Sequence, residues 1–75
     1  MIPRTEIINN HIVNSVEQLA SFLVPGDIFR KLRGRTQYRF NELRRSEQLV
    51  LCENLDTHTL EHIYFNSPVF KLVFI

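Results

Sequence analysis

The fold class of this chain depends on residues 13–24, VNSVEQLASFLV, which end at the pair Pro25-Gly26. Asn14 is a suitable N-cap, and Glu17 three residues later completes the spacing of a capping box. Proline cannot continue a helix, and glycine permits the turn that follows. Apolar residues recur at spacings of three and four, as on one face of an amphipathic helix; they are Val13, Val16, Leu19, Ala20 and Leu23, with Phe22 widening the stripe. The sequence therefore predicts a helix over residues 13–24.

From residue 27 to residue 75 the pattern changes to short β-prone runs separated by turn residues. Alternation of apolar and polar residues favours strands near 36–40, 59–65 and 69–75. Residues 28–32 and the apolar run 48–52 also have strand length, and the second run suits a central strand. Strands at this spacing predict a small, strongly bent sheet or barrel.

The chain shows no internal repeat, low-complexity tract or linker, so we expect a single domain over residues 1–75. Residues 1–12 are expected to form an irregular lead-in or a short edge strand, with a turn at Asn9-Asn10. One alternative stays open. Residues 38–49 are rich in helix formers, and a helix there would give a helix-rich or helix-turn-helix-like fold.

Length and composition limit the class of protein. A chain of 75 residues buries a modest core, and a deep catalytic pocket would use residues that the core needs, so we expect no enzyme. Cys52 is the only cysteine, which excludes an intramolecular disulfide and fits a reducing, cytoplasmic compartment. The first residues lack the pattern of a signal peptide. The longest apolar run, residues 72–75, falls far short of the ~20 residues of a membrane span, so we expect no membrane partner.

Charge is nearly balanced overall but is unevenly distributed along the chain. Residues 46–62 contain acids and no lysine or arginine. Residues 30–45 contain one acid, Glu42, and seven cations: Arg30, Lys31, Arg33, Arg35, Arg39, Arg44 and Arg45. These cations could be solvated faces that neutralise neighbouring strands, or a basic surface for an acidic protein or a nucleic acid. Interleaved aromatic residues favour nucleic acid, since rings on a sheet stack on bases.

Residues 22–65 resemble the YodC-like family of small SH3-like proteins. The family is largely uncharacterised, so the resemblance implies a fold and brings no activity. With it, the expected fold becomes α+β: an N-terminal amphipathic helix packed on a small SH3-like antiparallel sheet or barrel of about five strands. The residues that carry the resemblance are PGDIF at 25–29, Gly34, LVLC at 49–52, Leu60 and Phe65.

Two candidate chemical sites have weak support. Residues 58–62, HTLEH, match the H-x-x-E-H string of inverted zinc peptidases, which requires a helix. Their neighbours favour a strand, on which His58 and His62 would stand ~13 Å apart, too far to share a metal. Cys52 could be a nucleophile with either histidine as its base, but a lone cysteine in an apolar run is normally a buried hydrophobe. We therefore predict no catalytic residue, metal or cofactor.

The C-terminal run 69–75 is apolar on both sides apart from Lys71, with Phe70, Leu72 and Phe74 on one face. It is either the last core strand or an exposed edge that pairs with a partner or a second copy. Taken together, the sequence predicts a small non-catalytic protein-interaction or inhibitor module, able to self-associate. The alternative is a nucleic-acid-binding module that uses the basic residues 30–45.

Overall fold

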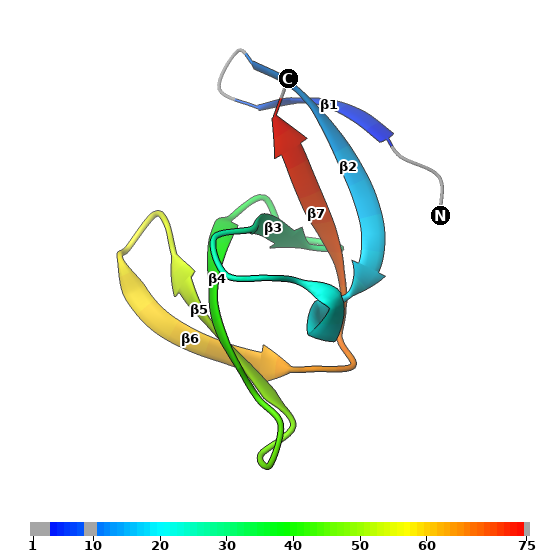
Figure 1. The fold of residues 1–75 in the computed structure, drawn as a ribbon. Coiled ribbons are helices and arrows are strands. Elements are labelled where there is room, and N and C mark those ends of the chain that lie inside the picture. The colour runs from blue at the N-terminus through cyan, green and yellow to red at the C-terminus, as the bar shows by residue number, and fades with distance from the viewer. Residues whose placement is uncertain (1–3, 9–10, 75) are drawn as a thin grey trace.

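The computed structural model describes the backbone of residues 4–8 and 11–74 and the side chains of residues 14–74. The predicted turn at Asn9-Asn10 and the first three residues lie outside this part. The described residues form seven strands and one short 3-10 helix, and they contain no α-helix (Figure 1). In chain order the elements are β1 (Arg4–Ile8), β2 (His11–Leu19), η1 (Ala20–Phe22), β3 (Ile28–Lys31), β4 (Gln37–Arg44), β5 (Leu49–Asn54), β6 (Thr59–Tyr64) and β7 (Pro68–Phe74).

All seven strands belong to one antiparallel sheet with the order β1-β2-β7-β3-β4-β5-β6. The sheet is strongly bent: β4, β5 and β6 form a meander on one side, while β1, β2 and β7 extend away from it (Figure 1). Strands β1 and β6 are its two edges, and β7 is an interior strand. No helix in the described part of the chain is long and apolar enough to cross a membrane.

The predicted helix over residues 13–24 is wrong, and with it the α+β fold class. Residues up to Leu19 continue β2, and only Ala20–Phe22 are helical, in a single 3-10 turn. β2 pairs with β7 at seven consecutive positions, from Val13↔Phe74 to Leu19↔Pro68. This long-range pairing provides backbone partners for residues 13–19 and overrides a local helical pattern.

The alternative helix over residues 38–49 is also wrong. Residues up to Arg44 form β4, and the helix formers that follow lie in the turn before β5. The β4–β5 register shifts between Phe40 and Glu42, so Asn41 forms a bulge. The strands expected from residue 27 onward are all observed, with shifted ends.

The core lies inside the bend of the sheet. Phe29 and Tyr38 stack there with ring centroids 5.5 Å apart. η1 closes one end of the bend, because the Ala20 N–H donates to the Ser67 carbonyl at 2.8 Å and the Ser21 N–H donates to the Phe65 carbonyl at 2.9 Å. The buried cluster consists of Ala20, Leu23, Phe29, Tyr38, Phe40, Val50, Cys52 and Val69. η1 therefore joins the β6–β7 connection and leaves the free edge of β6 uncovered by any described strand.

Candidate functional site

The edge strand β6 presents an unusual set of side chains to solvent. Within the part of the chain that the structure describes, it pairs with β5 alone. Its outer face carries Leu60, His62 and Tyr64, of which Leu60 is 62% exposed and Tyr64 is 72% exposed. Glu61 and Ile63 alternate with them and are partly buried. The side chains of Leu60 and Tyr64 are thus exposed on a strand whose outer edge pairs with no described strand.

One hydrogen bond shows which backbone groups of β6 are free. The Phe65 N–H donates to the Gln48 carbonyl at 3.0 Å, in line with the β5–β6 register. Residues of an antiparallel pair alternate between bonded and non-bonded positions. The odd-numbered residues of β6 therefore bond to β5, and the backbone groups of Leu60, His62 and Tyr64 point to the open edge.

Edges of this kind are normally protected by lysine, proline or a bulge. β6 has the sequence TLEHIY, without lysine or proline, and its pairing with β5 shows no register shift. One of its edge groups is used, since the Tyr64 carbonyl accepts the Ser67 N–H at 2.9 Å. The remaining edge groups, from Leu60 to the Tyr64 N–H, are available to a partner strand.

A groove of about 390 Å³ runs beside the open edge of β6. Its second wall is built from Lys31 at the end of β3 and from the start of β7. Ile63 and Val69 supply apolar surface, and the Lys31 ammonium lies 5.2 Å from the centre of the Tyr38 ring. The lining residues are Lys31, His62, Ile63, Tyr64, Ser67, Pro68 and Val69, so none of the described residues that line the groove is acidic.

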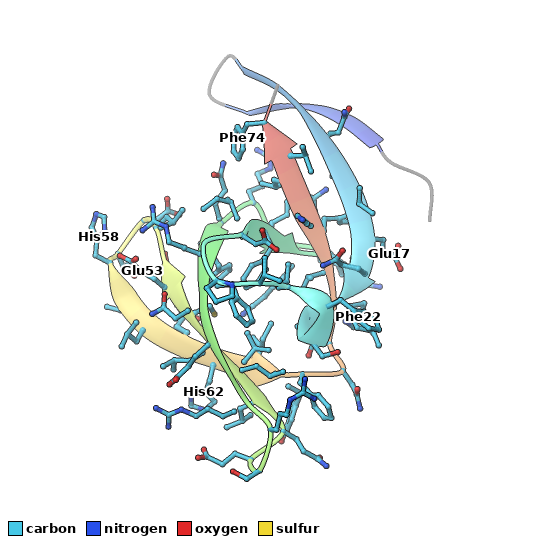
Figure 2. All side chains as sticks on the ribbon, viewed as in Figure 1. Glu17, Phe22, Glu53, His58, His62 and Phe74 are labelled. Carbon is cyan, nitrogen blue, oxygen red and sulfur yellow. The ribbon has the colours of Figure 1, made fainter. Side chains whose placement is uncertain are left out.

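The outer face of the β4–β5–β6 meander continues the apolar strip. Leu51 is the β5 neighbour of His62, and Leu49 is the neighbour of Tyr64. At the far end of the β5–β6 hairpin the surface is charged: Glu53 accepts a hydrogen bond from Arg39 at 3.1 Å and lies 3.3 Å from His58 (Figure 2). An extended partner on β6 would thus meet apolar side chains along the strand and charged ones at its end.

The structure divides the predicted basic residues into engaged and unengaged ones. Arg30 lies over the Phe70 ring at 4.5 Å and donates to the carbonyls of Lys31 and Leu32. Arg39 is paired with Glu53. Arg44 binds Glu42 at 3.0 Å and lies 3.9 Å from Glu47, and the hydrogen bond and charge of Glu42, followed by the charge of Glu47, raise its pKa. Arg33, Arg35 and Arg45 are exposed and make no ion pair with a described residue.

These cations do not form one surface. Lys31 ends β3 and Arg33 and Arg35 lie in the loop before β4, whereas Arg44 ends β4 and Arg45 follows it. A strand of that length separates the two groups by ~23 Å. Arg39 pairs with Glu53 on the neighbouring strand β5, and Arg44 pairs with Glu42 on its own strand. These pairs match local neutralisation better than a continuous anion-binding face.

Neither candidate chemical site is assembled. His58 lies in the β5–β6 turn and His62 in the middle of β6, and the two stand apart along the strand (Figure 2). Among the described residues no three His, Cys, Asp or Glu side chains form a group that could hold a metal. Cys52 is fully buried, and its Sγ contacts the Glu61 carbonyl oxygen at 3.5 Å. Burial, followed by the charge of Glu61, raises the pKa of the Cys52 thiol to about 11. His62 neighbours the strand partner of Cys52 and faces the other side of the sheet, so the two form no dyad.

The C-terminal run is not an edge strand. β7 pairs with β2 on one side and with β3 on the other. Phe70 and Leu72 are buried, and Phe74 is 47% exposed at the end of the strand, far from His62 (Figure 2). Docking of a partner strand along residues 69–72 therefore has no free backbone to use.

Sequence reasoning missed the edge at β6. The alternation of residues 59–65 was a signal for a strand with Leu60, His62 and Tyr64 on one face, but it contained no sign that this strand is at the edge of the sheet.

The chain matches no known family model, and comparisons with curated proteins and with solved structures gave no match. What it binds must therefore follow from its own geometry.

Proposed function

We propose that this protein is a non-catalytic interaction module that binds an extended segment of a partner protein as an additional strand on β6. One observation carries the proposal: the edge of β6 has backbone groups without a partner among the described residues, from Leu60 to the Tyr64 N–H, and His62 and Tyr64 also line a groove with apolar surface. In strand addition, main-chain hydrogen bonds supply affinity, and contacts to alternate side chains supply specificity.

The shape of the site favours a single extended segment. The groove has two walls, β6 on one side and Lys31 with Pro68 and Val69 on the other. One strand can lie between such walls with its backbone along β6. Its side chains would alternate between the groove and the outer face, where Leu60 and Tyr64 stand exposed.

The SH3-like assignment and the YodC-like relation belong to the same proposal. A bent antiparallel sheet with five consecutive strands, β3 to β7, is compatible with a small SH3-like unit. Nucleic-acid binding through residues 30–45 is the alternative function. Arg33, Arg35 and Arg45 support it by their exposure, and their separation along β4 counts against it.

A proline substitution at the edge tests the proposal. The His62 N–H points to the open edge. His62→Pro therefore removes one donor that β6 offers to the partner strand, and it removes no bond to β5. The matched control is His62→Thr, which keeps that donor. Peptides selected from a random library on the wild-type chain should bind His62→Thr and lose binding to His62→Pro. Their addition should shift the amide NMR signals of β6. Selected peptides that bind both variants equally, or that leave the β6 amides unchanged, would overturn the proposal.

A further inference from the structure

The charge around the groove is one-sided. Lys31 is exposed in its wall and makes no ion pair with any described residue; its ammonium contacts the Tyr38 ring instead. Lys31 is followed in the β3–β4 loop by Arg33 and Arg35, which are also exposed and unpaired among the described residues. The nearest acid on β6, Glu61, does not line the groove, and its carboxylate accepts the Asn54 amide at 2.8 Å.

Lys31 has a fixed place relative to β6. It pairs with Val69 in the β3–β7 register, next to Pro68, where β6 leads into β7. It therefore lies at the Tyr64 end of the open edge, and the loop with Arg33 and Arg35 continues beyond it. Unpaired positive charge is thus found at the Tyr64 end of β6, whereas near the start of β6 Arg39 and Glu53 form an ion pair.

Resting on the proposed function, we infer that the segment bound on β6 is acidic, with a carboxylate side chain at its end nearest Tyr64 that pairs with Lys31. A partner with aspartate or glutamate there supplies the anion that the groove lacks. Close opposite charges steer encounter and fix the register of an added strand. Binding of such a segment weakens with added salt, because the pair is only partly buried.

A second copy of this chain does not meet the same requirement. Its own β6 would present Leu60, His62 and Tyr64 at the edge, and its one acid, Glu61, is turned inward and bound to Asn54. Self-pairing through β6 would therefore leave Lys31 without an anion. The observations favour a separate acidic partner over a homodimer at this edge.

Peptides of equal length that differ in charge separate this inference from the proposed strand addition on β6. The probes are blocked peptides of about nine residues that alternate valine with glutamate, glutamine or lysine. Each is titrated into the labelled full chain and into two variants. Lys31→Gln removes the groove cation. Lys71→Gln is the matched control, because it removes the only other lysine, which pairs with Asp27 at 3.6 Å and does not line the groove.

We expect the glutamate peptide to bind the wild type about two- to fivefold more tightly than the glutamine peptide, as a partly exposed ion pair allows. Lys31→Gln should abolish this preference, and Lys71→Gln should keep it. Equal binding of the two peptides, with β6 amides shifted by both, would overturn the acidic preference and leave strand addition intact. A short mixed-sequence DNA that shifts the amides of residues 31–35 while no peptide shifts β6 would overturn both and establish the nucleic-acid alternative.

Discussion

The backbone N–H of Phe65 donates to the carbonyl oxygen of Gln48 at 3.0 Å, at the point where β6 leaves the sheet. This bond sets the phase of the whole β5–β6 pair. Ile63, two residues earlier and opposite Val50, is therefore in a bonded position, while His62 beside it is not. The N–H of Ile63 thus bonds to β5, whereas the N–H of the adjacent His62 points to the open edge.

A proline scan should reveal this alternation as a difference in stability. Ile63→Pro removes a ladder hydrogen bond and truncates a side chain packed against the core, and it should lower the free energy of unfolding by roughly 2–4 kcal/mol. His62→Pro removes no bond to β5, so its free energy of unfolding should fall by only about 1 kcal/mol. Urea denaturation followed by circular dichroism measures both. A larger loss in His62→Pro than in Ile63→Pro would show that β6 is bonded in the opposite phase, and equal losses would contradict the alternation.

Gln48 is expected to be a site where glycine stabilises the fold. It is exposed in the β4–β5 turn and has a φ of 57°, in the left-handed region. A residue with a Cβ is strained there by about 1–2 kcal/mol, and glycine is not. After the entropy that glycine loses on folding, Gln48→Gly should raise the free energy of unfolding by about 0.5–1 kcal/mol. Gln48→Val should lower it, because a branched Cβ fits this conformation worst.

The neighbouring Glu47 provides the control for that experiment. It is equally exposed but does not have a positive φ. Glu47→Gly should therefore destabilise the protein slightly, since it adds backbone freedom to the unfolded chain and removes a weak, exposed ion pair with Arg44. If both glycine variants change stability by the same amount, the strain at Gln48 is not what limits this turn.

Local pattern was a good guide from residue 27 onward because those strands are short meander neighbours separated by clear turn residues. It failed at residues 13–24, where Val16, Leu19 and Ala20 fit a helical stripe. The state of that stretch is decided by β7, which pairs with residues 13–19 of β2 from 49 to 61 positions further along the sequence. No local window contains that partner.

The same limit applies to the candidate site. Alternation identified the solvent face of β6 through Leu60 and Tyr64, and it identified the apolar face of β7 through Phe70 and Leu72. Which of these strands has a free edge depends on the sheet order, since β2 covers β7 and nothing described covers β6. Sequence alone left β7 open as either a core strand or an edge strand, and it gave no sign that β6 has the free edge.

Alanine substitutions at Phe29 and Phe22 should differ strongly in their effect on stability, because one ring is in the core and the other is on the surface. Phe29 is fully buried and stacks on Tyr38, so Phe29→Ala should cost about 3–5 kcal/mol, enough to unfold a domain of this size. Phe22, expected from the helical pattern to widen a buried stripe, is 67% exposed, and Phe22→Ala should change stability by less than about 0.5 kcal/mol. Thermal unfolding measures the pair, and a large loss at Phe22 would show that its ring is covered in solution.

Cys52 should make the protein lose stability in alkali. Burial raises the pKa of its thiol from the ordinary 9.0 to about 11 in the folded chain. Below pH 9 the thiol is protonated in both the folded and the unfolded chain, so its contribution to the free energy of unfolding is fully present. Between pH 9 and 11 the unfolded chain ionises first and is stabilised. The free energy of unfolding should therefore fall through this range, by about 2–3 kcal/mol in all.

The variant Cys52→Ala isolates this effect from other groups that titrate in alkali. It should be less stable than the wild type at pH 7 by about 1 kcal/mol, because a small cavity replaces the sulfur. Its deficit should shrink and then reverse as the pH rises from 9 to 11, since it has no thiol to ionise. Urea denaturation of both proteins at each pH gives the difference. A deficit that stays constant across the range would mean that the Cys52 thiol ionises as readily in the folded chain as in the unfolded one.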